Sequence, residues 1–423
     1  MQDRTPKRRH ERPATPHMTH LTCPDGFLAH GVTAGLKPSG KPDLAVVLAP
    51  RGATAAALLT TNLVHAAPLV ITADHLARTG GRARALLINA GCANAATGPE
   101  GERRARACVA AVAKAAGCRD EEVLVNSTGV IGVQLPVERI VTAVPALLQG
   151  AAADGFERAA GAIMTTDTRM KVAEARDTQG RFRVVGMAKG AGMIHPSMAP
   201  AGVGSGTADA GGAPHATMIA VMLTDATVDA ARLEAILSRA CDRSFHRITV
   251  DGDTSTNDAV FALASGAAGR VDEAALEAAF TEVARTLALQ VVRDGEGATR
   301  VLTVAVEHAT TRPDALAVAR TVAMSLLVRT AVAGGDPNWG RILAAIGRAG
   351  VPVDLQRLTV TADGVRLFAS GAPIQVPPDD RARIFRGSDV RIEIDLALGD
   401  GSDEFHTCDL TKEYVAINAE YTT

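Results

Sequence analysis

The sequence PAGVGSGTADAGGAPHA (200–216), followed by TMIAVML (217–223), contains the most abrupt change of composition in the chain. Residues 200–216 are dominated by Gly, Ala, Pro and Ser and have no hydrophobic periodicity, which predicts a flexible loop. After its first threonine, the segment 217–223 is continuously apolar, which predicts a buried strand. The sequence therefore predicts a rigid strand that begins with Thr217 directly after a flexible loop that ends at Ala216.

Thr217 is a candidate nucleophile because cleavage before it would expose its own α-amine as a base for its hydroxyl. An unperturbed α-amine has a pKa of about 8, close to a working pH. The small residue Ala216, the flexible loop upstream and the strand downstream all suit such a role. The alternative is an ordinary strand threonine, which the local pattern alone leaves open.

A second candidate element is NSTGVIG (126–132), which follows the apolar residues 123–125. The Thr128 hydroxyl and the Gly129 backbone N–H are donors that can stabilise an oxyanion, and one such donor is typically worth about 3 kcal/mol. The alternative is an ordinary turn from a strand to a helix, with a helix N-cap.

Apolar runs and amphipathic segments alternate along the rest of the chain, which predicts an α/β fold with mixed α+β layers. The 47% hydrophobic content is sufficient for an extensive core. The predicted strands include residues 45–48, 85–89 and 122–125, and the predicted helices are residues 101–116, 136–149, 230–243, 273–292 and 314–333.

The overall composition excludes several classes of partner. A formal charge of −2 and 3% aromatic residues do not favour nucleic acid or an anionic membrane, so we expect small-molecule substrates. Six scattered cysteines without a CxxC pair predict reduced thiols in the cytoplasm and no zinc site. Residues 1–22 are basic and contain several prolines, and we expect a disordered extension there.

Several distinctive sequence blocks occur in a fixed order from near residue 24 to the last residue. With them the chain resembles the ornithine acetyltransferase family, whose fold is of the N-terminal-nucleophile type. The blocks are NAGCANAATG (89–98), NSTGVIG (126–132), IMTTDT (163–168), GMAKGAGMIHPSMA (186–199), TMIAVMLTDA (217–226), DGDTSTND (251–258), DGEGATR (294–300), DPNWGR (336–341) and CDLTKEYVAINAEYTT (408–423).

The resemblance implies a role for specific residues. Thr217 would be the nucleophile and new N-terminus after self-cleavage between Ala216 and Thr217, and Thr128 with Gly129 would form the oxyanion hole. The chain would then consist of an N-terminal fragment, 23–216, and a C-terminal fragment, 217–423. The residues implied in substrate binding are Thr165, Lys189, Thr217, Glu296, Asn418 and Thr423.

The implied reaction is a ping-pong transfer of acetyl from N-acetylornithine to glutamate in arginine biosynthesis. It requires neither metal nor organic cofactor, although acetyl-CoA is a further acetyl donor for some members. The implied assembly is a heterotetramer of two N-terminal and two C-terminal fragments.

Two features depart from the family pattern. Residues 200–216 are inserted where the family runs from HPxMA directly into TM, and Cys92 occupies a position where asparagine is commoner. Three alternatives stay open from the sequence: a paralogue of secondary metabolism acting on other N-acetyl amino acids, a hydrolase of the same fold, and a binding protein whose site the insertion has disabled.

Overall fold

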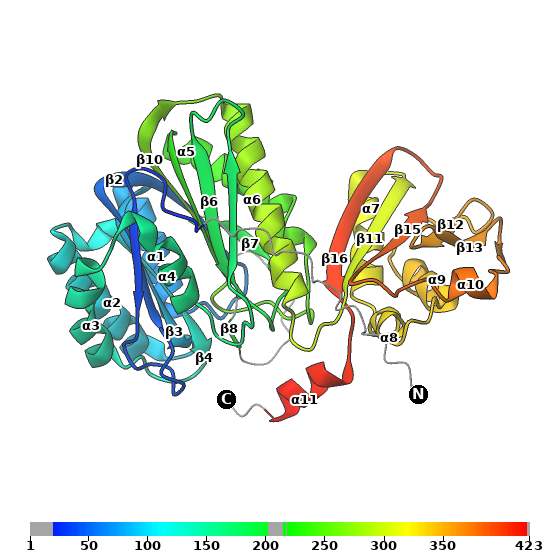
Figure 1. The fold of residues 1–423 in the computed structure, drawn as a ribbon, viewed down its shortest axis with the longest axis horizontal. Coiled ribbons are helices and arrows are strands. Elements are labelled where there is room, and N and C mark those ends of the chain that lie inside the picture. The colour runs from blue at the N-terminus through cyan, green and yellow to red at the C-terminus, as the bar shows by residue number, and fades with distance from the viewer. Residues whose placement is uncertain (1–19, 202–214, 217, 421–423) are drawn as a thin grey trace, which may run out of the picture.

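The computed structural model describes residues 20–201, 215–216 and 218–420, and these form two β-sheets with helices packed on them (Figure 1). The larger sheet has ten strands, eight of them in the order β5-β6-β9-β10-β2-β3-β4-β8, and both β1 and β7 pair with β2. Neighbouring strands are antiparallel except β3 with β4 and β9 with β10. The strands are β1 (Leu28–Val32), β2 (Leu44–Thr60), β3 (Arg82–Cys92), β4 (Val123–Val130), β5 (Lys171–Arg176), β6 (Arg183–Lys189), β7 (Met198–Pro200), β8 (His215–Ala216), β9 (Ile219–Thr227) and β10 (Ala259–Arg270).

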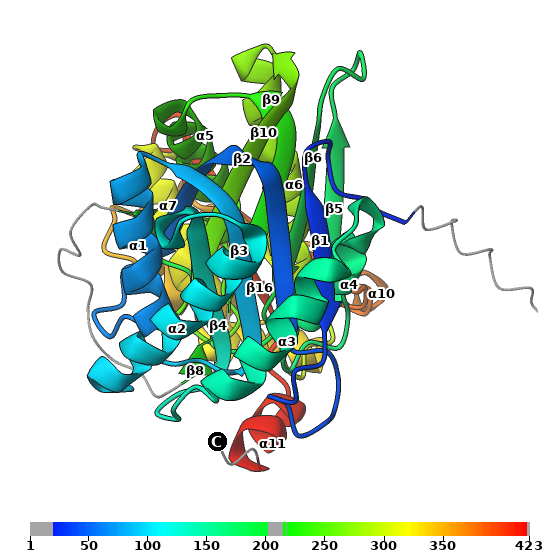
Figure 2. The same cartoon turned by 90° about the vertical axis from the view of Figure 1, so that its left-hand side faces the viewer.

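Both faces of the larger sheet are buried. In β9, Ala220 and Met222 face the core that contains α5 and α6, whereas Val221 and Leu223 face the core that contains α4. Helices α2 and α3 cover β3 and β4 and lie in front in Figure 2. Because a strand with two buried faces needs apolar residues at every position, the run 218–223 has no alternation. The helices are α1 (Ala67–Thr79), α2 (Gly98–Ala116), α3 (Val137–Gln149), α4 (Phe156–Ala162), α5 (Ala230–Asp242) and α6 (Glu273–Arg293), with short 3₁₀ turns at Asp120–Glu122, Ala153–Gly155 and Phe245–Arg247.

The smaller sheet follows α6 and has six strands in the order β14-β13-β12-β15-β11-β16. Its core lies on one face only, because β15 alternates between exposed and buried residues. Helix α11 follows β16 and, in both views, lies at the lower edge of the molecule (Figures 1 and 2). The elements are β11 (Val301–Ala309), α7 (Arg312–Ala323), α8 (Leu326–Gly334), α9 (Trp339–Gly347), β12 (Thr359–Ala362), β13 (Val365–Ala369), β14 (Ala372–Pro373), α10 (Pro378–Arg381), β15 (Asp389–Asp395), β16 (Gly401–Cys408) and α11 (Lys412–Glu420).

The structure confirms the mixed α/β class and corrects several local predictions. The predicted helix 314–333 is two helices, α7 and α8, with a bend of 58° between them. Ser325 caps α8 by accepting a hydrogen bond from the Val328 backbone N–H, so a new helix begins there. Residues 126–130 belong to β4 and do not form a turn, because backbone pairing with β3 continues to Val130.

The predicted disordered extension, 1–22, is wrong at its last three residues. The Leu21 backbone N–H donates to Glu157 at 3.0 Å, and the Thr22 hydroxyl accepts from Arg183 at 3.0 Å. Residues 1–19 of that prediction lie outside the described part of the chain.

The predicted junction between Ala216 and Thr217 falls inside the larger sheet. Strand β8 ends at Ala216 and β9 begins at Ile219, and both belong to that sheet. The change from one sheet to the other comes later, between the end of α6 at Arg293 and the start of β11 at Val301. Cleavage at the predicted junction would therefore leave two fragments that share one sheet.

In the described ranges, no single helix is long and apolar enough to cross a membrane, and one bent pair, α7 with α8, passes on length and composition alone.

Candidate active site

Strand β4 carries the two residues that the sequence predicts as an oxyanion hole. Thr128 is fully buried, and Gly129 has a φ of +131°. A Cβ atom on Gly129 would lie 2.4 Å from the carbonyl carbon of Gly91 in β3. Since no side chain fits that gap, glycine is required at position 129 for β4 to pass this close to β3.

Strand β8 brings the residue before the predicted cleavage site to this glycine. Ala216 pairs with Gly129 in an antiparallel register, and His215 pairs with Val130. On the other side of the junction, the Met218 backbone N–H donates to Asp258 Oδ1 at 3.0 Å. Thr217 itself lies outside the described residues, but both of its neighbours in the chain are held by hydrogen-bonded partners.

Lys189 contacts the predicted oxyanion hole from the end of β6. Its Nζ atom donates to Thr128 Oγ1 at 3.1 Å, and neither residue is exposed to solvent. Four strands separate β6 from β4 in the sheet, so the sheet must curve to bring these two strand ends together. Burial lowers the pKa of Lys189 to about 8, although the charge of Asp167 opposes the shift.

The segment 255–258 connects the two sides of the site. Asp258 is fully buried and accepts hydrogen bonds from the backbone N–H groups of Met218 and Ser255. Burial raises the pKa of this carboxyl to about 7. The Asn257 side chain donates to the Ser127 carbonyl oxygen at 2.8 Å. This segment therefore fixes β4 relative to the start of β9.

Two of the predicted substrate-binding residues, Asn418 in the last turn of α11 and Glu296, contact each other. The Asn418 side-chain amide donates to Glu296 Oε2 at 3.1 Å, although 122 positions separate the two residues. A Cβ atom on Gly192 would lie 2.3 Å from the same Glu296 oxygen, so the carboxylate lies directly against this glycine. The Glu296 backbone N–H also donates to the Ala191 carbonyl oxygen at 2.9 Å. Glu296 is thereby placed near the segment that follows Lys189.

Thr165 is linked to Lys189 through Asp167. The Asp167 carboxylate accepts hydrogen bonds from the backbone N–H groups of Thr165, at 2.9 Å, and Gly190, at 2.7 Å. The structure thus relates Thr128, Thr165, Lys189 and Glu296 through short chains of contacts. Thr423, the last predicted substrate contact, lies outside the described residues.

Five functional candidates were not singled out from the sequence: Asp167, Lys171, Asn257, Asp258 and Asp294, the last of which pairs with Lys171. Asp167, Asp258 and Asn257 lie in blocks that carry the family resemblance, but only burial and contacts distinguish them from their neighbours. A sequence signal existed for Lys171 alone, as a charge on a strand face that otherwise carries Ala173 and Ala175.

Metal ligation is not indicated by the described residues, since no group of three or more His, Cys, Asp or Glu side chains could hold an ion there.

The buried imidazole of His195 faces the guanidinium of Arg320. Burial, reinforced by that charge, lowers the pKa of His195 to about 4, so the ring is neutral near pH 7.

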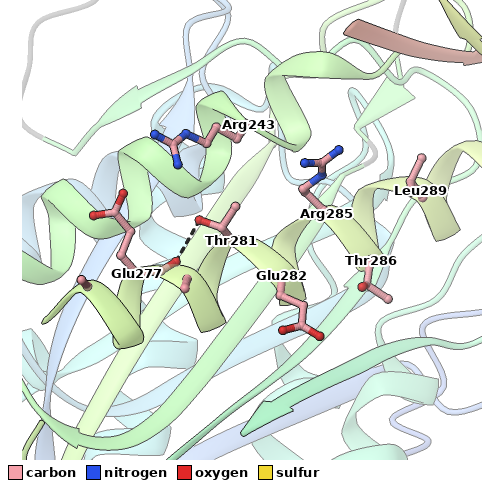
Figure 3. A pocket seen from close by; sticks show the side chains of 9 residues that line it. Arg243, Glu277, Thr281, Glu282, Arg285, Thr286 and Leu289 are labelled. Atoms are coloured by element: carbon pink, nitrogen blue, oxygen red, sulfur yellow. Dashed lines mark hydrogen bonds between the residues drawn. The ribbon is translucent and has the colours of Figure 1, made fainter. Parts of the chain in front are cut away.

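A separate hollow of about 660 Å³ lies along the outer side of α6 (Figure 3). It is lined by Arg243, Glu277, Thr281 and Arg285, among others, and by none of the predicted site residues. The Thr281 hydroxyl donates to the Glu277 carbonyl oxygen in the preceding turn of the helix, as the dashed line in Figure 3 shows. This hollow is therefore distinct from the candidate active site.

The fold and these contacts define the class of protein: a mixed α/β enzyme whose candidate site lies in the larger sheet. There, a buried lysine contacts a buried threonine hydroxyl. A family model described as "ArgJ family" matches residues 28–423. The chain belongs to the ArgJ family. This membership confirms the predicted enzyme class, an ornithine acetyltransferase of arginine biosynthesis.

Curated relatives match along nearly their whole length. The arginine biosynthesis bifunctional protein ArgJ of Parasynechococcus marenigrum (strain WH8102) is 44% identical over 406 residues, which cover 95% of each chain. The protein of the same name from Deinococcus radiodurans is 42% identical over 412 residues, which cover 97% of this chain and 100% of the relative.

Two solved structures are also similar. An ArgJ structure from Bacillus halodurans has a TM-score of 0.45 and 37% identity, and the match covers 47% of this chain and 96% of that one. A structure of ornithine acetyltransferase complexed with ornithine, from Mycobacterium tuberculosis, has a TM-score of 0.40 and 42% identity, with 43% of this chain and 96% of that chain covered.

Proposed function

We propose that this chain transfers the acetyl group of N-acetylornithine to glutamate through an acetyl ester on Thr217. The Thr217 hydroxyl attacks the acetyl carbonyl carbon while the Thr217 α-amine takes the hydroxyl proton. The bond from the acetyl carbon to the ornithine nitrogen breaks, and the α-ammonium returns the proton to the leaving amine. The glutamate amine then attacks the ester and releases the threonine hydroxyl.

One observation carries this proposal: the pairing of Ala216 with Gly129 beside the contact between Lys189 and Thr128. It supports an oxyanion hole at Thr128 and Gly129, because the residue before the nucleophile lies against the residues that would bind the oxyanion. The same arrangement supports self-cleavage between Ala216 and Thr217, since attack on the Ala216 carbonyl would use the same donors.

The amino-acid portions of the substrates would be bound by the remaining predicted residues. The Lys189 ammonium has three donors, so it can pair with a substrate carboxylate and still donate to Thr128. Glu296 can pair with a substrate ammonium, and Thr165, Asn418 and Thr423 would fix orientation. No metal or organic cofactor takes part in this scheme, and acetyl-CoA would be an additional acetyl donor.

After cleavage, the fragments 23–216 and 217–423 would remain together because both contribute strands to the larger sheet. We propose that two copies of each assemble into a heterotetramer and that the enzyme acts in the cytoplasm. The latter is supported by the six cysteines, all of them described and none in a disulfide.

The direct test is to incubate the purified protein with N-acetylornithine and glutamate and to analyse the products by mass spectrometry. Ornithine together with N-acetylglutamate is the expected result. Ornithine without N-acetylglutamate would instead indicate a hydrolase, and no product would overturn the proposed reaction. The same assay with acetyl-CoA and glutamate tests the second donor.

A further inference from the structure

A buried cluster of three charges lies beside the candidate site. The Lys171 Nζ atom, at the start of β5, is 2.6 Å from Asp167 Oδ1 and 2.6 Å from Asp294 Oδ2. The side chains of Asp167, Lys171 and Asp294 are 0%, 1% and 5% exposed. We call these three residues the charge triad.

Stability alone does not explain why this cluster of charges is buried. Removing charges from water is costly, and well-packed apolar residues often stabilise a core equally well. The triad also has two carboxylates for one ammonium, and the charge of Lys189 acts on Asp167 as well. Burial alone would raise the pKa of Asp167, but the charges of Lys189 and Lys171 and the Gly190 N–H lower it to about 2.

The two carboxylates of the triad also accept hydrogen bonds from backbone N–H groups of the segment 165–168 and of Gly190. Asp167 accepts from the N–H groups of Thr165 and Gly190, the latter next to Lys189. Asp294 accepts from the Thr168 N–H at 3.0 Å and from the Thr168 hydroxyl, and it precedes Glu296 by two residues. Lys171 joins the two carboxylates and therefore joins these segments.

We propose that Asp167, Lys171 and Asp294 are positioning residues that hold Thr165, Lys189 and Glu296 at the spacing that an ornithine-like ligand requires. The inference rests on the proposed function, because it takes these three residues as the substrate contacts. None of the triad residues needs to touch substrate. Their effect is on the affinity for ligand, since a mispositioned pair of charged contacts no longer fits both ends of one molecule.

The test compares two double variants with the wild type. Lys171→Met combined with Asp294→Asn removes one positive and one negative charge, which leaves Asp167 balanced by Lys189. The matched control is Arg293→Met combined with Asp389→Asn. These substitutions are of the same kind, but they remove an exposed ion pair whose arginine directly precedes Asp294. Ornithine affinity is measured by calorimetry, and thermal unfolding is recorded for each protein.

The triad variant should bind ornithine about tenfold more weakly than the wild type, and the control should bind it equally well. An ornithine affinity within twofold of wild type, with only a lowered Tm, would overturn the inference, because a purely structural triad would behave in that way. If the double variant does not fold, Lys171→Arg serves instead, since it keeps the charge but alters the spacing of the carboxylates. A severalfold loss of affinity is then expected, and an unchanged affinity would again overturn the inference.

The wild-type transfer assay separates this inference from the proposed function. A wild type that binds ornithine without transferring acetyl would refute the proposed reaction, and the affinity of the triad variant would still decide the role of the triad. A wild type that does not bind ornithine would overturn both.

Discussion

The two sheets differ in where their charged side chains lie. The ten-stranded sheet is covered on both faces, yet Thr128, Lys171, Lys189 and Asp258 are buried at its strands and strand ends. The six-stranded sheet has one covered face, and its strand β15 places its charged side chains on the other face. Because burial of unpaired polar groups is unfavourable, the polar groups of the larger sheet persist only as a connected network.

The contrast indicates where the chemistry is concentrated. In the larger sheet, apolar packing would be simpler than the observed network, so the network is the best candidate for selection by function. Strand β15 of the smaller sheet needs no such explanation, because its charges are solvated, whereas β16 buries His406 and Thr407. Variants at the buried polar groups of the larger sheet should therefore lower activity. Variants in the core of the smaller sheet should lower stability and leave activity unchanged.

The largest effect is expected for Thr217→Ala. If the larger sheet carries the nucleophile, this change removes the hydroxyl that both cleavage and acetyl transfer would use, so both should be abolished. Intact-mass analysis would show only the full-length chain, and the transfer assay would show no product. A variant that is still cut between residues 216 and 217 would remove Thr217 from the mechanism.

Thr128→Ala should lower kcat by about a hundredfold, because it removes one proposed oxyanion donor and the hydroxyl that Lys189 contacts. KM should change little, since the interaction is stronger in the transition state. Steady-state kinetics would distinguish the two parameters. Thr128→Ser is the control, because it keeps a hydroxyl, and unchanged turnover in Thr128→Ala would leave the residue with a structural role only.

Gly192→Ala should raise KM for N-acetylornithine by about tenfold, since a displaced Glu296 would lose its proposed pairing with the substrate ammonium. The added methyl group would lie 2.3 Å from Glu296 Oε2, so the carboxylate must move. Gly161→Ala in α4 is the matched control, because a Cβ atom there meets nothing within 4 Å. Equal KM values for both variants would argue against Glu296 as a substrate contact.

A smaller effect is expected from the glycines of the inserted segment 200–216, because glycine permits more backbone conformations than alanine does ahead of the proposed cleavage site. Replacing all five by alanine keeps the loop length and should speed fragment formation severalfold. The rate is measured by denaturing gel after expression. Slower cleavage would mean that loop flexibility assists the reaction rather than opposing it. The five positions are Gly202, Gly204, Gly206, Gly211 and Gly212.

The smallest effect on activity is expected for Trp339→Leu, at the start of helix α9, which packs on the smaller sheet. The indole stacks on Phe368 with ring centroids 6.0 Å apart and packs against the core of that sheet. Its loss should destabilise the protein by about 2 kcal/mol and leave acetyl transfer unchanged. Chemical denaturation and the transfer assay give the two values, and a loss of turnover without unfolding would show that the contrast between the sheets is too simple.

The sequence predicted the regular elements best where one periodicity continued without interruption. Helices α2, α3, α5 and α6 were predicted to within three residues at each end, because each has an apolar face at helical spacing. The single helix predicted over 314–333 was wrong because the pattern does not reveal that Ser325 begins a new helix. The continuation of β4 to Val130 was missed because strand pairing depends on β3, which lies elsewhere in the chain.

The sequence by itself determined the mixed α/β class, the apolar strand after the inserted loop and the blocks that carry the resemblance to the family. Only the tertiary structure decided that Lys189 reaches Thr128, that Asn418 meets Glu296 and that Lys171 is buried between two carboxylates. In sequence, Lys171 lies on the same face of β5 as Ala173 and Ala175, and the pattern does not show what would balance a charge on that apolar face. Its burial depends on Asp294, 123 positions away, because a charge can leave water only where the fold supplies a partner.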